Sequence, residues 1–156
     1  MKKLAILAPV TVLIFACQNA DQLQAGQWEM SFKATDVQVP GAPPEVQAQA
    51  KQALASQTQQ TQSRCMSDAE AANPAASLAA GGGAGGGAGG CTFTKQTFEG
   101  GNIDIAGTCG QAQMAFTGTY TPTTMDMQFT TTMSMGPQQV RTSGTVTGRR
   151  TGDCAS

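Results

Sequence analysis

The chain has 156 residues, the length of a single domain, with nine basic side chains, ten acidic side chains and no histidine. The slight acidic excess argues against nucleic acid as a partner, because phosphate backbones are bound mainly through clustered lysine and arginine. Without histidine, the chain lacks the usual base for a serine nucleophile and a common zinc ligand.

The first segment of the chain predicts export. Lys2 and Lys3 precede an apolar run over residues 4–16. This run is too short to cross a bilayer and is typical of the apolar region of a signal peptide. We therefore expect residues 1–16 to be a lipoprotein signal peptide. Loss of both lysines on cleavage would make the mature chain more acidic.

The end of this run, IFAC, predicts lipid attachment. A small residue before Cys17 is the pattern that lipoprotein signal peptidase recognises. Acyl chains on Cys17 would hold the protein on a membrane, at roughly 0.8 kcal/mol per buried methylene, and residues 17–25 would form a tether. Gln18 in place of aspartate favours the outer membrane. Simple secretion, with cleavage near Ala16 or Ala20, is the alternative.

The folded part is expected to begin at Gly26 with a strand. Trp28, Met30 and Phe32 alternate with polar residues, as in a strand with one buried face. A turn-rich segment, VPGAPP, follows. Apolar residues at helical spacing then predict a helix over Glu45–Arg64, which contains few large apolar side chains and needs to dock to be stable.

A short second helix is expected next, with Ser67 and Glu70 as its capping box and Pro74 at its end. The run GGGAGGGAGG over residues 81–90 has no side chains to pack and predicts a flexible linker inside the domain. A phosphate-binding loop would need a flanking strand and helix and a lysine or hydroxyl, which this run lacks.

The rest of the chain reads as strands joined by short turns. The segment CTFTKQTFEGGNIDIAGTC predicts a hairpin around Gly100. Three further strands follow in MAFTGTY, TMDMQFTTTMSM and the segment from Val140 to Arg149. The predicted fold class is mainly β: an antiparallel six-stranded meander, as a curled sheet or small barrel, with one or two peripheral helices. Residues 26–154 would form one β-rich domain stapled by disulfides.

Four cysteines remain after Cys17 is assigned, and they allow three pairings. Cys91 and Cys109 are equidistant from Gly100, so the hairpin places them opposite one another. That pairing leaves Cys65 with Cys154. Zinc and thioredoxin-like sites both favour Cys-x-x-Cys spacing, which is absent, and disulfides are typical of exported proteins.

Methionines on one strand are the only candidate metal ligands. Alternate residues of a strand face the same way, and exported clusters of thioethers can bind soft Cu(I). The four methionines are Met125, Met127, Met133 and Met135. Shared parity with Phe129 favours the simpler interpretation that they fill an irregular core.

The hairpin segment, the ending TGRRTGDC, the opening AGQWEM and the segment CMSDAEAANP together resemble the bacterial domain of unknown function 3617 family. The resemblance covers about residues 25 to 154, with Ala25 where proline is common and a long Gly/Ala insert before Cys91. It implies exported or lipid-anchored proteins of Gram-negative bacteria and no established activity, so no functional residue is carried over.

Function is expected to be non-enzymatic, because no two acid or base groups converge on the predicted strands. We expect a structural or interaction module of the cell envelope, periplasmic and anchored to a membrane, with no cofactor. One alternative is a carrier of a lipid or other apolar molecule, since a curled sheet can enclose a cavity. The other is periplasmic Cu(I) binding.

Overall fold

Seven strands and two helices form the part of the chain described by this computed structural model, residues 22–56, 59–74, 91–136 and 138–155. The elements are β1 (Gly26–Gln38), α1 (Pro44–Ala55), β2 (Gln60–Met66), α2 (Asp68–Ala72), β3 (Cys91–Glu99), β4 (Asn102–Cys109), β5 (Ala112–Tyr120), β6 (Thr124–Met135) and β7 (Gln138–Gly152).

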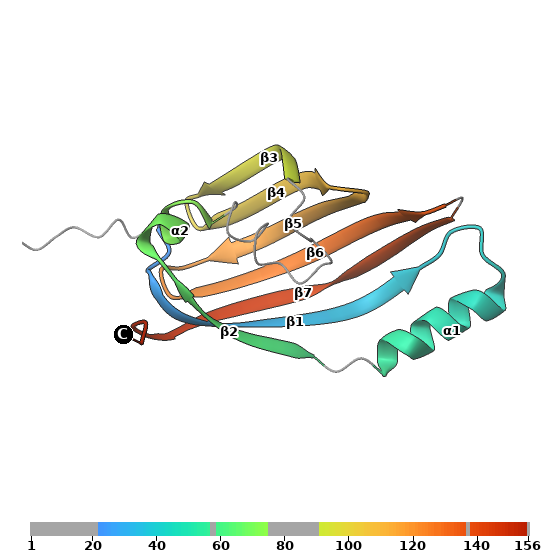
Figure 1. The fold of residues 1–156 in the computed structure, drawn as a ribbon, viewed down its shortest axis with the longest axis horizontal. Helices are drawn as coiled ribbons and strands as arrows, with labels where there is room; N and C mark the ends of the chain where they lie inside the picture. The colour runs from blue at the N-terminus through green and yellow to red at the C-terminus, as the bar shows by residue number, and fades with distance from the viewer. Residues whose placement is uncertain (1–21, 57–58, 75–90, 137, 156) are drawn as a thin grey trace, which may run out of the picture.

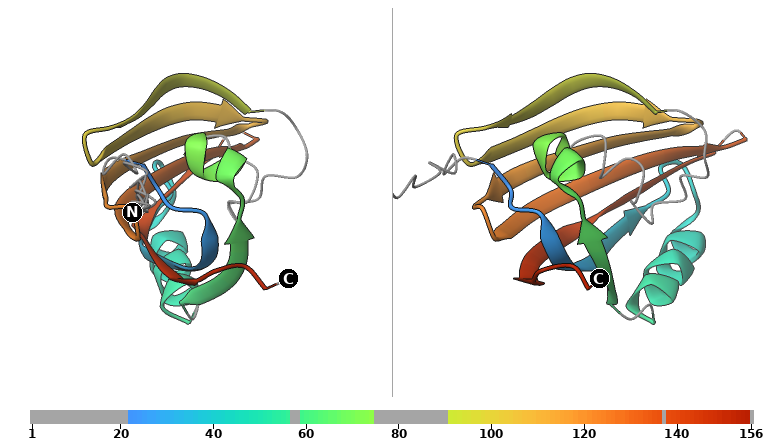
Figure 2. Two further views of the ribbon diagram at one scale, coloured as in Figure 1. Left: turned by 90° about the vertical axis from the view of Figure 1, so that its left-hand side faces the viewer. Right: turned by 60° about the vertical axis from the view of Figure 1, so that its left-hand side comes forward.

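All seven strands belong to one antiparallel sheet with the order β2-β1-β7-β6-β5-β4-β3. The last five strands form a meander, and β1 pairs with β7 so that the two ends of the domain lie side by side (Figure 1). The sheet curls into a trough, with β2 and β3 at its open edges (Figure 2). The predicted fold class is confirmed in the form of an open curled sheet.

The predicted number of strands is wrong, because β2 was expected to be helical. Helix α1 ends at Ala55, and Gln60–Met66 instead pairs with β1 along its whole length. Five of the seven residues of β2 are exposed, so this edge strand shows no apolar alternation. Pairing with β1 holds this segment in the extended conformation. Within that pairing, Thr61 and Ser31 lie opposite each other and their hydroxyls share a hydrogen bond of 3.0 Å.

The β3–β4 hairpin carries a β-bulge that changes which face its residues occupy. Phe93 pairs with Gly107, but Lys95 pairs with Ala106, so Thr94 is an extra residue in β3. Simple alternation would place Lys95 inside and Phe98 outside. The bulge reverses both: Lys95 forms an ion pair with Asp104, and Phe98 packs on the core.

Both predicted disulfides are present. Cys91 is directly opposite Cys109 in the ladder, with Cα atoms 4.2 Å apart, and the two sulfurs are bonded. Cys65 on β2 is bonded to Cys154 just after β7, with Cα atoms 5.4 Å apart. The second bridge fastens the edge strand to the C-terminal end of the sheet.

The two helices attach to opposite ends of the trough. The side-chain amide of Gln47 on α1 donates to the carbonyl of Val39 at 3.0 Å and accepts from its N–H at 3.4 Å. Helix α2 has the predicted capping box: the Ser67 hydroxyl accepts from the Glu70 N–H, and the Glu70 carboxylate accepts from the Ser67 N–H. Helix α2 marks what we call the α2 end of the trough (Figure 1).

Candidate functional site

The inner face of the trough is apolar along its length and is the main candidate surface. Alternate residues of each strand point inward. Most threonine, serine and charged residues of the strands lie on the outer face, and Thr131 and Thr142, which are paired on the inner face, are exceptions. Buried residues of the core cluster come from β1 and the segment just before it, from β2, β4, β5, β6 and β7, and from α2. The inner face divides into a closed half at the α2 end and a more open half beyond it.

The closed half is a solid core. Trp28 is fully buried, and its indole N–H donates to the carbonyl of Gln24 at 2.9 Å. Leu23, Met66 and Ala71 pack in the same cluster, so the packed domain includes residues before Gly26. Buried aromatic and aliphatic groups of this kind supply most of the folding free energy in a domain of this size.

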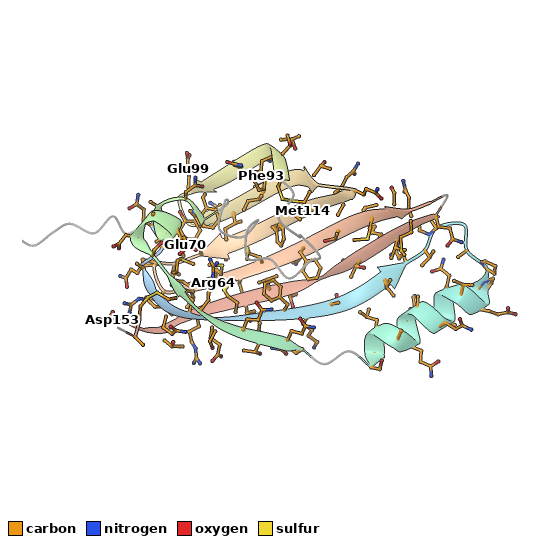
Figure 3. The ribbon with its side chains drawn as sticks, in the orientation of Figure 1. Arg64, Glu70, Phe93, Glu99, Met114 and Asp153 are labelled. Atoms are coloured by element: carbon orange, nitrogen blue, oxygen red, sulfur yellow. A yellow bond between two sulfur atoms is a disulfide. The ribbon has the colours of Figure 1, made fainter. Side chains whose placement is uncertain are left out.

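The open half is lined by aromatic rings that lie against glycines. An added Cβ on Gly107 would lie 3.0 Å from the Phe93 ring, and one on Gly144 would lie 2.7 Å from the Phe129 ring. Each ring therefore rests on a bare stretch of backbone. Figure 3 shows Phe93 and Met114 extending from neighbouring parts of this face.

Cross-strand pairing defines a compact group that we call the Thr131 patch. Thr131 on β6 pairs with Met114 on β5 and with Thr142 on β7. The pairs before and after it along β6 place Phe116 beside Phe129 and Ala112 beside Met133. The patch comprises Phe93, Met114, Phe116, Phe129, Thr131 and Met133.

Thr131 is the unusual member of this patch. Its side chain is 8% exposed, and its hydroxyl oxygen is buried with no hydrogen-bond partner among the described residues. Leaving a buried hydroxyl unpaired costs roughly 1–3 kcal/mol. Around it, Phe93 and Phe129 are only partly buried and Met133 is 37% exposed. A polar group without a partner therefore lies beneath apolar side chains that remain partly accessible.

Four ion pairs link charged side chains of the described residues at the surface. Glu29 pairs with Arg149 at 3.6 Å on the outer face. Arg150 pairs with Asp153 and also donates to the carbonyl of Ala25 at 2.7 Å. These contacts give the adjacent arginines, Arg149 and Arg150, a structural role at the end of the sheet. Within the described parts of the chain, no acidic and basic side chains converge in a cleft.

Glu70 is the described group with a clear pKa shift. Hydrogen bonds from the backbone and side chain of Ser67 lower its pKa, with a smaller contribution from Arg64, whose guanidinium lies 3.6 Å away. The cause is the capping box of α2, and the carboxylate is exposed. The shift therefore reflects helix capping and carries no catalytic meaning.

The four candidate copper ligands do not converge on one point. Met125 and Met127 are each 2% exposed within the core, whereas Met135, near the end of β6, is 62% exposed. Met30 on β1 and Met125 both lie against Gly148, where an added Cβ would be 2.7 Å from the Met30 sulfur and 3.4 Å from the Met125 sulfur. No group of three or more His, Cys, Asp or Glu suited to a metal occurs in the described segments.

A hollow with a volume of about 330 Å³ lies on the outer face beside Gly118. Polar residues of β5, β6 and β7 line it together with Gly118 and Met127: Thr117, Thr119, Asp126, Gln128 and Thr145. It is shallow and open to solvent. Nothing in its surroundings concentrates charge or leaves a buried polar group unpaired among the described residues.

Several predicted features lie outside the described residues: the signal peptide, Cys17 with most of the tether, and the linker over 81–90. Sequence reasoning also missed Thr131 as a site residue. The available signal was its position on the apolar parity of β6, between Phe129 and Met133. Alternation alone does not reveal whether such a hydroxyl has a partner, because the partner would come from another strand.

Comparison with known proteins gives one match. A family model described as a protein of unknown function (DUF3617) matches residues 23–154. No curated protein and no solved structure matches the chain. The match begins at Leu23, which is buried in the core. Among the described residues, neither helix has the length and apolar character needed to cross a membrane.

Proposed function

This chain belongs to the DUF3617 family, and from that premise we propose that it is an exported, membrane-anchored protein of the cell envelope that binds an apolar small molecule on its inner face. Binding is its activity, and it catalyses no reaction. The observation that carries this proposal is the Thr131 patch, where the partly accessible side chains of Phe93, Phe129 and Met133 accompany an unpaired, buried hydroxyl. Curled sheets bind small apolar molecules in this way.

Export is supported by the two disulfides, which persist in oxidising compartments outside the cytoplasm. The basic and apolar leader and the cysteine at position 17 agree with this compartment. Lipid at Cys17 would place the trough next to a membrane, and a membrane is the main reservoir of apolar molecules in the envelope.

The absence of catalysis is supported by the separation of polar and apolar faces. Carboxylates such as Glu29 and Asp104 lie in outer-face ion pairs. Acid–base catalysis needs groups that meet in one cleft. The apolar inner face offers binding energy without a reacting group in its described residues.

A protein partner is the alternative occupant of the inner face. The curl of the sheet favours a small molecule, because a folded partner would have to insert a segment between the edge strands β3 and β2 to reach the inner face (Figure 2). Cu(I) binding has less support, because Met125 lies in the buried core whereas Met135 lies at the exposed end of β6.

Two measurements test the proposal. Substitution Cys17→Ser should move the protein from the membrane fraction to the soluble envelope fraction, and an unchanged membrane fraction would reject lipid anchoring. Binding to the inner face is tested with the fluorescent apolar probe N-phenylnaphthylamine. We expect saturable binding that Phe129→Asp weakens and Thr145→Asp, on the outer face, leaves unchanged. Equal effects of both substitutions would reject the inner face as the site.

A further inference from the structure

The unpaired hydroxyl of Thr131 indicates what kind of apolar molecule fits. A pure hydrocarbon would leave this hydroxyl without a partner, at the same energetic cost as in the free protein. A ligand with one hydrogen-bond acceptor among apolar atoms would remove that cost on binding. Differential binding of this kind is a strong source of specificity in apolar sites, because a buried polar group discriminates against ligands that cannot pair with it.

The charge of the surroundings indicates which acceptor is favoured. Among the described inner-face residues, neither the Thr131 patch nor the residues paired with it on neighbouring strands include a lysine or arginine. Arg150 lies at the α2 end, where it pairs with Asp153 and the carbonyl of Ala25. An ionised carboxylate would be buried beside Thr131 without a countercharge, which is strongly unfavourable. A neutral carbonyl accepts the same hydrogen bond without that penalty.

The shape of the open half indicates an extended chain. The inner face is closed at the α2 end by the core around Trp28 and Met125. From Phe129 to Met135 the strand β6 covers six residue steps, or about 20 Å at the usual rise per residue. Met133 and Met135, the exposed large apolar residues on this path, lie at its outer end. Thioethers are flexible enough to move aside for a chain.

We propose that the Thr131 patch binds one ester-linked acyl chain of a membrane lipid, with the Thr131 hydroxyl donating a hydrogen bond to the ester carbonyl and the chain lying along the inner face over Phe129, Met133 and Met135. This inference rests on the proposed function, because it specifies the ligand of the same face. The membrane beside the anchor supplies such chains.

The test compares three probes on the full chain: methyl palmitate, palmitate and hexadecane. They share a long chain and differ in carrying a neutral ester, a carboxylate or no acceptor. Binding is measured by equilibrium partition of the radiolabelled probe. We expect methyl palmitate to bind about tenfold more tightly than hexadecane, the ratio expected for one hydrogen bond to a buried hydroxyl.

Substitution Thr131→Val should remove this preference, because it weakens the binding of methyl palmitate and leaves the binding of hexadecane unchanged. Thr131→Ser keeps a hydroxyl and should retain the preference. Thr130→Val, on the opposite face, should have no effect. A preference that survives in Thr131→Val would overturn the role of Thr131 and leave the binding function standing. Tighter binding of palmitate than of its methyl ester would overturn the assignment of a neutral carbonyl. Failure of all three probes to bind would overturn the proposed function itself.

Discussion

Cys91 and Cys109 face each other across the first rungs of the β3–β4 ladder, although the turn of that hairpin is centred between Gly100 and Gly101. A hairpin with this turn and no irregularity would shift the two cysteines out of register by one residue. The bulge at Thr94 supplies the missing residue, so the same feature aligns the disulfide and turns Phe98 inward.

The two disulfides should differ in how much they stabilise the fold. Cys91–Cys109 spans 18 residues and Cys65–Cys154 spans 89. In the chain-entropy description, loops of these lengths contribute about 3 and about 4.6 kcal/mol. We expect the paired alanine variant of Cys65 and Cys154 to lose more stability in urea denaturation than the paired variant of Cys91 and Cys109. The reverse order would show that local packing outweighs chain entropy here.

Removing the hydroxyl of Thr131 should stabilise the ligand-free protein. Thr131→Val keeps the shape of the side chain and eliminates a buried group that has no partner among the described residues. We expect a gain of about 1–2 kcal/mol in the free energy of unfolding. Thr130→Val on the outer face is the matched control and should change stability by less than about 0.5 kcal/mol. A loss of stability in Thr131→Val would mean that the hydroxyl is paired in solution, for example with water.

Two glycines of β7 should differ in their tolerance of a methyl group. A Cβ on Gly144 would lie 2.2 Å from the carbonyl oxygen of Lys33 and 2.7 Å from the Phe129 ring, whereas one on Gly152 would meet nothing within 4 Å. We expect Gly144→Ala to destabilise the protein by about 1–3 kcal/mol and Gly152→Ala to be neutral. Similar thermal midpoints for the two variants would contradict the close packing of Phe129 on the sheet.

The capping box of α2 should make stability depend on pH at the acidic end. The pKa of Glu70 is lowered in the folded state from an ordinary value of 4.5, chiefly by hydrogen bonds from Ser67. Its contribution is therefore complete above the unfolded pKa and is lost as the pH falls through the lower folded value. Glu70→Gln should be less stable than the parent near neutral pH, and this difference should vanish at low pH. A difference that is constant with pH would rule out a contribution from the charge.

Most of the meander could be predicted from sequence because its strands alternate strongly. Met125, Met127 and Phe129 share one parity, and the structure places all three on the inner face. β2 could not be predicted in the same way: it is a polar edge strand, and only its pairing with β1 makes it a strand. In the sequence, the bulge at Thr94 shows only indirectly. Simple alternation would place Lys95 on the inner face and Phe98 on the outer face, which suits neither side chain.

The candidate site was the least predictable part. Its apolar members follow from alternation, but the meaning of Thr131 depends on what β5 and β7 place beside it, which is Met114 and Thr142. Whether a hydroxyl is paired is a property of the three-dimensional neighbourhood. Local sequence carries no direct signal of that kind.

The measurement that tests the central claim most directly is native mass spectrometry of the full chain, extracted in mild detergent from the cells that express it. If the inner face binds an apolar molecule, the protein should carry a stoichiometric lipid mass beyond any covalent modification, and Phe129→Asp should lose it. A parent protein that retains no such mass, or a lipid that remains bound to the Phe129→Asp variant, would contradict the account.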